Sequence, residues 1–266
     1  TDFSQVPLPI LLSAGATVAL AADDPLLFRS RLVAQYEVAR DVFGLSDEAL
    51  ASLARSSIDA SLASPSHKAA WKADIDAWLS KLDRTYEAYR DLVGDVPFDG
   101  RKIMILNTPG IEPGYWALAG NPILWNSHVA VSKLLDRTVE FGDWGFGIIH
   151  EIGHVFSQGN ISGTGRWNWN DEMFANFRMQ YGLEQNQGKV WMDERVYTGR
   201  EILDMYKKDY DNTVYTQVND NGIHYMLGRL AGPGGIGWEP FKAAFRELTT
   251  TGGAPSGKYD KFEYLL

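Results

Sequence analysis

The stretch WGFGIIHEIGHVF, residues 144–156, places two of the chain's five histidines four positions apart, with a glutamate directly after the first. Most of its other residues are apolar, which is typical of a buried helix. Residues i and i+4 lie on the same face of an α-helix, so His150 and His154 can direct both imidazoles at one point. The stretch therefore predicts a helix that carries a pair of metal ligands.

The glutamate of this stretch adds a possible base. Glu151 lies about 100° around the same helix from His150, beside the metal position, where its carboxylate can reach water at the metal. An HExxH helix can in this way supply two zinc ligands and a general base. The alternative is that the two histidines simply pack in an apolar core, and a third ligand decides between these interpretations.

A catalytic zinc needs a third protein ligand and an open position. The chain has no cysteine, so that ligand must be a histidine or a carboxylate. We predict Glu172, which lies eighteen positions after His154 and opens an expected helix, with Asp171 as the nearest competitor. Asp171 is better suited to capping the helix. Asn176, one turn after Glu172, is predicted to hydrogen-bond a ligand histidine.

The composition restricts the partners of the protein. Its 266 residues are enough for one large domain or for two lobes with a shared cleft. The net charge of -9 arises from 34 acidic and 25 basic residues, which argues against a nucleic-acid or anionic-membrane partner. The apolar run over residues 7–22 has no basic flank and is interrupted by Pro, Ser and Gly, so we interpret it as strand-forming core sequence and expect no membrane insertion.

The pattern along the chain predicts an α+β fold dominated by helices. Residues 1–95 are expected to be largely helical, with a long amphipathic helix over 65–93, and two short strands follow within 101–108 and 114–125. Further helices are expected at 132–139, 144–158, 170–183, 199–210, 219–230 and 238–248. We divide the catalytic unit into an N-terminal helical part (1–95), a lobe with the sheet and active-site helix (96–158), and a C-terminal helical lobe (159–266).

Two kinds of side chain are candidates for contact with a substrate. His224 and Tyr225, with Tyr215 upstream, could donate a hydrogen bond to an oxyanion, although a buried core position is as good an interpretation for each.

The tryptophans around the motif could stack on sugar rings, and of these we select Trp116, Trp167 and Trp169. Asn121 ends a segment that could pair with an extended peptide. Core packing is the alternative for every tryptophan.

At this point the sequence resembles a known class. HEIGH, followed by a Trp-containing loop and then by Glu172 and Asn176, is similar to the gluzincin class of zinc metallopeptidases. The upstream YWALAGNPI and the pattern W-x-W-x-x-E-x-x-x-N more narrowly resemble the enhancin-like and mucin-degrading metallopeptidases. The resemblance spans about Tyr115 to Tyr181, and Val155 departs from it where the family commonly has asparagine.

The resemblance implies a thermolysin-like gluzincin fold, with a small mixed-sheet lobe and a helical C-terminal lobe on either side of a cleft. It implies a zinc endopeptidase of mucin-like, O-glycosylated proteins, with His150, His154 and Glu172 as ligands and Glu151 as base. Such units belong to secreted or cell-surface bacterial proteins. We therefore expect a monomeric segment of a larger exported multidomain protein, with which the missing initiator Met agrees.

Three alternatives remain open from the sequence. A glycoprotein- or carbohydrate-binding module of the same fold would have lost a ligand or the base. A structural zinc would need a fourth protein ligand, for which His128 or His224 could serve. A zinc hydrolase of a non-peptide substrate would share the same motif chemistry.

Overall fold

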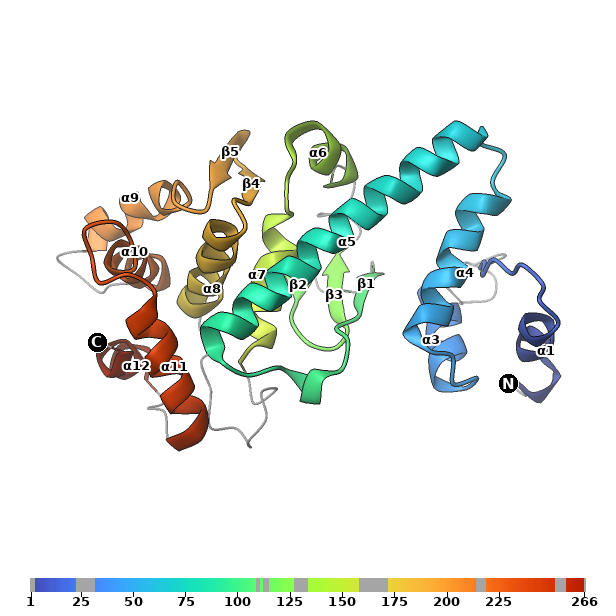
Figure 1. The fold of residues 1–266 in the computed structure, drawn as a ribbon, viewed down its shortest axis with the longest axis horizontal. Helices are drawn as coiled ribbons and strands as arrows, with labels where there is room; N and C mark the ends of the chain where they lie inside the picture. The colour runs from blue at the N-terminus through green and yellow to red at the C-terminus, as the bar shows by residue number, and fades with distance from the viewer. Residues whose placement is uncertain are drawn as a thin grey trace. The chain divides into compact units, whose positions relative to one another are not determined.

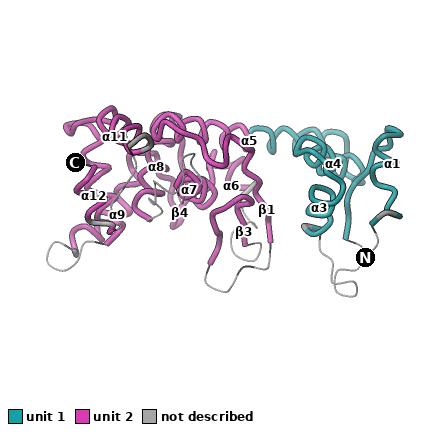
Figure 2. The backbone as a smooth tube through the Cα atoms, turned by 90° about the horizontal axis from the view of Figure 1, so that it is seen from below, with its two compact units in different colours: residues 1–77 teal, residues 78–266 magenta. Residues whose placement is uncertain are grey.

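The protein is described by a computed structural model that divides into two compact units, residues 1–77 and residues 78–266 (Figure 2). The described residues are 3–22, 32–108, 111, 115–126, 134–157, 172–213, 219–251 and 257–265. The long helix α5 (Pro65–Val93) runs through the boundary between the units. Our predicted lobes divide the chain elsewhere, after residues 95 and 158, and they stay a prediction.

The regular elements described in unit 1 are all helices. Its elements before α5 are η1 (Phe3–Gln5), α1 (Leu8–Ser13), α3 (Leu32–Asp41) and α4 (Asp47–Ala60). Ser46 caps α4 by accepting the N–H of Ala49 at 3.3 Å, and two acidic residues follow in the first turn. The prediction of a strand within residues 7–22 is wrong, because Pro9 lies in the first turn of α1, where a helix needs no N–H.

Unit 2 contains the remaining elements (Figure 1). They are η2 (Phe98–Gly100), β1 (Ile105–Thr108), β2 (Ala117–Leu118), β3 (Ile123–Asn126), α6 (Leu134–Phe141), α7 (Phe146–Val155), α8 (Glu172–Gln185), β4 (Lys189–Met192), β5 (Arg195–Thr198), α9 (Leu203–Thr213), α10 (Asp220–Leu230), α11 (Glu239–Thr251) and α12 (Lys258–Leu265). No helix among the described residues is long and apolar enough to cross a membrane.

A three-stranded sheet precedes the motif helix. Its strand order is β1-β3-β2, with β1 parallel to β3 and β2 antiparallel to β3. Ile105 pairs with Ile123, and Ala117 pairs with Trp125. Strand β3 is central and largely buried, as its apolar side chains require, and both β2 and β3 contact α7.

Helices α7 and α8 form the centre of the core of unit 2 (Figure 1). Residues 147–155 of α7 and residues 173–183 of α8 are all buried. The two helices also contact each other. A helix that is buried on every side needs a partner for each polar side chain it carries, so the polar residues of α8 must be bonded within the core.

A β-hairpin that the sequence did not predict supports the start of α7. Strands β4 and β5 are antiparallel, with Val190 opposite Tyr197. Asp143 is 2 % exposed, and its Oδ1 accepts the backbone N–H groups of Gly145 at 2.9 Å and Trp191 at 3.0 Å. One buried carboxylate thus joins the N-terminal end of α7 to the hairpin.

An ion-pair network joins α5, α8 and α11. Asp91 accepts a hydrogen bond from Tyr181, and the Nζ of Lys242 lies 2.8 Å from its Oδ2. Burial alone would raise the pKa of Asp91, but the bonds from Lys242 and Tyr181 outweigh it and hold this pKa below its ordinary value. A carboxyl group whose pKa is lower in the folded state stabilises the fold above its unfolded pKa and loses that effect as the pH falls.

We therefore expect Asp91→Asn to lower the free energy of unfolding by about 0.5–1 kcal/mol at neutral pH, a small value because Asp91 is half exposed. The difference from the wild type should shrink as the pH falls below about 4, where the carboxyl group becomes protonated in the unfolded chain. Urea unfolding of both proteins at pH 7 and pH 3 measures this. An equal difference at both pH values would contradict the role of the charge.

Candidate metal centre

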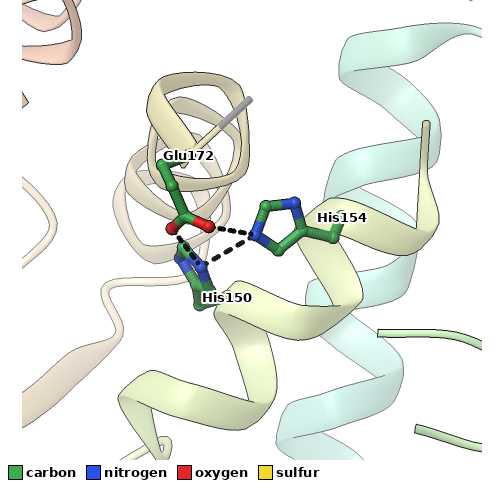
Figure 3. Close-up of side chains that lie close together, drawn as sticks. All are labelled: His150, His154 and Glu172. Carbon is green, nitrogen blue, oxygen red and sulfur yellow. Dashed lines mark hydrogen bonds and ion pairs between the residues drawn. The ribbon is translucent and has the colours of Figure 1, made fainter. Parts of the chain in front are cut away.

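The two histidines of the motif lie one turn apart on α7 and face the same point (Figure 3). Their Nε2 atoms are 3.0 Å apart, and both side chains are almost fully buried. Helix α7 begins after Gly145, whose φ of 79° lies in the left-handed region that favours glycine. A Cβ on Gly147 would come within 2.2 Å of the Trp116 ring, so this first turn packs too closely for a side chain.

Glu172 completes a group of three at the first residue of α8 (Figure 3). Its Oε2 lies 3.0 Å from His150 Nε2, and its Oε1 lies 3.3 Å from His154 Nε2. The ligand atoms of the three residues all lie within 4.8 Å of one another. Nitrogen and oxygen ligands at tetrahedral angles around zinc are about 3.3 Å apart, so the observed separations fit that ion.

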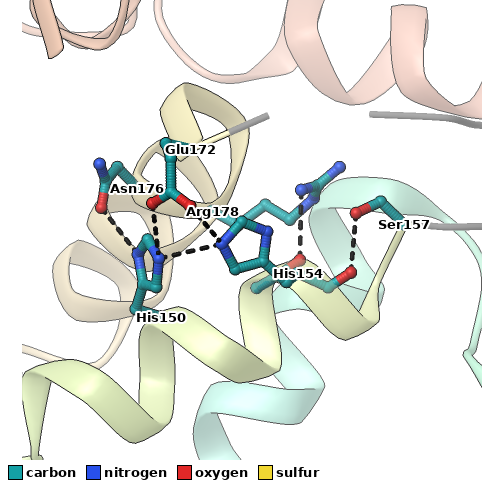
Figure 4. A network of polar contacts seen from close by, with 7 residues as sticks. His150, His154, Ser157, Glu172, Asn176 and Arg178 are labelled. Carbon is teal, nitrogen blue, oxygen red and sulfur yellow. Dashed lines mark hydrogen bonds and ion pairs between the residues drawn. The ribbon is translucent and has the colours of Figure 1, made fainter. Parts of the chain in front are cut away.

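A hydrogen bond orients the first histidine (Figure 4). Asn176 Oδ1 lies 2.9 Å from His150 Nδ1, one turn along α8 from Glu172. Because an amide oxygen only accepts, this contact assigns the proton to Nδ1 and leaves the lone pair of Nε2 free to bind a metal. Asn176 thus lies within hydrogen-bond distance of His150, and its role in orienting a metal ligand stays a prediction.

The two carboxylates of the centre lie in different electrostatic surroundings. The close contacts with the imidazoles of His150 and His154 hold the pKa of Glu172 far below its ordinary value, so this group is ionised. Burial raises the pKa of Glu151, against the opposing charges of the two histidines, and Glu151 is only 8 % exposed. The first is suited to binding a cation and the second to exchanging a proton.

The predicted oxyanion donors are not part of this group. His224 is fully buried, its Nε2 lies 3.0 Å from Gln180 Oε1, and burial lowers its pKa to about 3. The ring centroid of Tyr225 lies 4.9 Å from that of Tyr210, and the two rings are tilted by 30° to each other. Tyr215 lies outside the described residues. Catalytic roles for His224 and Tyr225 stay predictions.

The predicted substrate-binding residues that the structure describes, Trp116 and Asn121, contact other residues of the protein. Trp116 stacks on Phe146, which in turn stacks on His150. Asn121 bonds the backbone of residues 102 and 104 through both atoms of its amide, which joins the start of β3 to the segment before β1. Trp167 and Trp169 lie outside the described residues, so contact of any of these residues with a substrate stays a prediction.

Sequence reasoning missed Phe146, which flanks His150, and Arg178, which lies in the core of α8. The side chain of Arg178 is fully buried, and it donates a hydrogen bond to the carbonyl oxygen of Gly153 on α7. A signal was present in the sequence: a single arginine interrupts the apolar run of an expected core helix.

A cavity of about 310 Å³ lies on a different side of α7 from the two histidines. Ile152, two residues after His150 and so roughly 200° around the helix, forms part of its wall with Leu82, Tyr86 and Ile103. None of the three candidate ligands lines it, so this apolar cavity is separate from the metal centre.

Comparison with known proteins relates the first part of the chain to a different family. Residues 1–78 match the adenosine deaminase family.

A protein of Streptomyces coelicolor with the provisional name adenosine/adenine deaminase is 53% identical over 75 residues, 28% of this chain and 22% of that protein. A Streptomyces virginiae protein with the same name is 52% identical over 76 residues, 29% and 22% of the two chains. An adenine deaminase of Mesorhizobium japonicum is 36% identical over 75 residues, 28% and 23% of the two chains. The chain thus spans about a fifth of the length of the curated relatives it matches, and no solved structure matches it.

These matches overturn the recognition of an enhancin-like or mucin-degrading metallopeptidase. The gluzincin fold class, the metallopeptidase activity and the glycoprotein or mucin-like partner were all implied by that recognition, and they are wrong with it. The binding-module alternative depended on the same partner. The error has a physical cause, because the geometry of a metal site requires the same short motif in unrelated proteins. The resemblance rested on residues 115–181, whereas the deaminase match lies in residues 1–78.

The zinc prediction is confirmed. Adenosine deaminases depend on zinc, and this chain has a group of residues that can hold it. The group lies in unit 2, beyond the residues that match the family, and its donors, separations and oriented imidazole all fit the ion.

We expect Asn176→Ala to weaken zinc binding by about 10-fold to 100-fold, because His150 loses the acceptor that fixes its tautomer. Competition with a chelating dye measures the affinity. Asn176→Asp is the matched control, since it keeps an acceptor oxygen at the same position and should bind zinc close to normally. Wild-type affinity in the alanine variant would contradict this role.

Proposed function

We propose that this protein is a zinc-dependent hydrolase that activates water at the group of His150, His154 and Glu172, with Glu151 as the general base. The observation that carries the proposal is the convergence of two imidazole nitrogens and one carboxylate, with a second, buried carboxylate, that of Glu151, on the same helix as the imidazoles. Zinc bound there would lower the pKa of water and polarise the bond under attack. Three protein ligands leave a coordination position for this chemistry.

The residues of the chain have separate tasks in this proposal. Asn176 holds His150 in the tautomer that presents Nε2, and Glu172 contributes negative charge at the first turn of α8. Glu151 accepts a proton from water at its carboxylate and delivers it to the leaving group. Burial raises the pKa of the Glu151 carboxyl group, a direction that favours proton exchange.

A structural, closed zinc site is less well supported. Among the described residues the group has three members, and His224 is bonded to Gln180 in the core instead of joining it. His128, the other candidate for a fourth ligand, lies outside the described residues. An open position favours catalysis over a purely structural role.

For the substrate we propose an aminopurine, adenine or adenosine, because the relatives carry deaminase names. Water would add at C6 of the purine, the C–N bond to the exocyclic amine would break, and ammonia would leave after taking a proton. This assignment rests on the relatives of residues 1–78, whereas the hydrolase assignment rests on the geometry of unit 2. The two parts of the proposal can therefore fail separately.

The test is release of ammonia from adenine and from adenosine by the zinc-loaded protein and by Glu151→Gln. We expect the variant to retain zinc and to lose about 100-fold or more of the activity, the usual contribution of a general base. Glu140→Gln changes an exposed glutamate on α6 and should act like the wild type.

Two results would contradict parts of the proposal. If the protein binds one zinc per chain but releases no ammonia, the aminopurine assignment is wrong. If Glu151→Gln retains zinc and full deaminase activity, Glu151 is not the base.

Export from the cell stays a proposal. It is supported only by the absence of cysteine, which exported proteins share with many others. Immunoblotting of culture medium and of cell fractions would test it, and protein confined to the cytosol would contradict it.

A further inference from the structure

Arg178 is a positive side chain with no exposure to solvent, on helix α8, which also carries Glu172 and Asn176. Its Nη1 donates to the carbonyl oxygen of Gly153 at 3.2 Å (Figure 4). A guanidinium group loses its hydration when it is buried, so hydrogen bonds or ion pairs to the guanidinium group must offset this free-energy cost.

The carbonyl oxygen that Arg178 reaches lies in the last turn of α7. Carbonyl groups at a helix end lack a partner within the helix. Ser157 lies four residues after Gly153, but its N–H bonds the oxygen of His154 at 3.0 Å instead. One turn earlier, the carbonyl oxygen of Ile149 accepts the hydroxyl of Tyr89 at 2.8 Å. Two neighbouring helices therefore donate side-chain hydrogen bonds to α7 at positions four residues apart.

Gly153 also determines how closely the two helices approach. A Cβ at this position would lie 2.8 Å from the oxygen and 3.1 Å from the Cα of Ala175. These are backbone atoms of α8, so they cannot move aside as the end of a side chain can. Glycine between the two motif histidines thus permits the contact that an alanine would prevent.

The same two helices carry every member of the metal group. His150 meets Asn176, both histidines meet Glu172, and Gly153 meets Ala175. A shift of α7 along α8 would separate Glu172 from the imidazoles before it disturbed either helix internally.

We propose that Arg178 and Gly153 are positioning residues that fix α7 on α8 in the register at which Glu172 meets both histidines. This inference deepens the proposed function, because it rests on the metal group as a zinc site. It gives the glycine of HEIGH and a buried arginine a role in maintaining the distances between the candidate metal ligands. Both residues act through the contact between the two helices, not as ligands of the metal.

The experiment compares zinc affinity with folding in three variants. Arg178→Met keeps a long side chain but removes the donor, Arg178→Lys keeps the charge, and Gly153→Ala adds one methyl group at the contact between the helices. We expect each folded variant to bind zinc at least about 10-fold more weakly, with Arg178→Lys least affected. Zinc affinity is measured by chelator competition, and circular dichroism at the same temperature shows the folded fraction.

Cobalt substitution gives a readout that a loss of stability does not change. The visible absorption of bound Co²⁺ reports the number and arrangement of its ligands, and we expect this spectrum to differ between the folded variants and the wild type.

Two control variants separate an effect on helix register from an effect on stability. Leu248→Ala removes core volume on α11 and should lower stability without changing zinc affinity or the cobalt spectrum. Arg229→Met changes an exposed arginine on α10 and should change neither property.

The outcomes distinguish this inference from the proposed function. Folded Arg178→Met and Gly153→Ala proteins with wild-type zinc affinity and cobalt spectrum would overturn the positioning role. If the arginine variant does not fold, Gly153→Ala and Arg178→Lys decide by the same criteria. Failure of the wild type to bind zinc would overturn both the site and this inference. Zinc binding without deaminase activity would overturn only the substrate, and the affinity measurements would still test the register.

Discussion

The backbone contact between α7 and α8 is the constraint on which the rest of the metal centre depends. Gly153 lies against the backbone of Ala175, closer than any residue with a Cβ would allow. Side chains then bond across the contact, from Asn176 to His150 and from Arg178 to the last turn of α7. Because helix interiors are rigid and close-packed, a fixed contact at one point determines the separation of groups one turn away.

This packing has an electrostatic consequence for the centre. Both histidines are buried, and the carboxylate of Glu172 balances any positive charge that they or a bound cation bring. Glu151 lies on the same buried helix as the histidines, and burial raises its pKa, whereas the contacts with the two histidines lower the pKa of Glu172. Two carboxylates near one site acquire different properties from their surroundings alone, which is how one centre can both bind a cation and move a proton.

The two units of the chain relate to known proteins in different ways. The deaminase match covers residues 1–78 and ends where the first compact unit ends, at residue 77. The metal group and the helices that hold it all belong to the second unit. A short motif such as HEIGH indicates the geometry of a metal site. Sequence identity over 75 residues indicates common descent, so the two observations do not bear on the same property of the protein.

The sequence alone determined that His150 and His154, the candidate metal ligands, share one face of a helix, because their spacing matches helical periodicity. It also indicated Glu172 and Asn176, since both follow at helical spacing in a segment of helical pattern. It could not show the hairpin under Asp143 or the role of Arg178, because these depend on contacts across 48 and 25 residues of chain. Whether His224 faces a site or a core was likewise decided only by tertiary packing, which places it against Gln180, 44 positions away. Local spacing fixes which side chains share a face of a helix, whereas what that face meets depends on residues far apart in sequence.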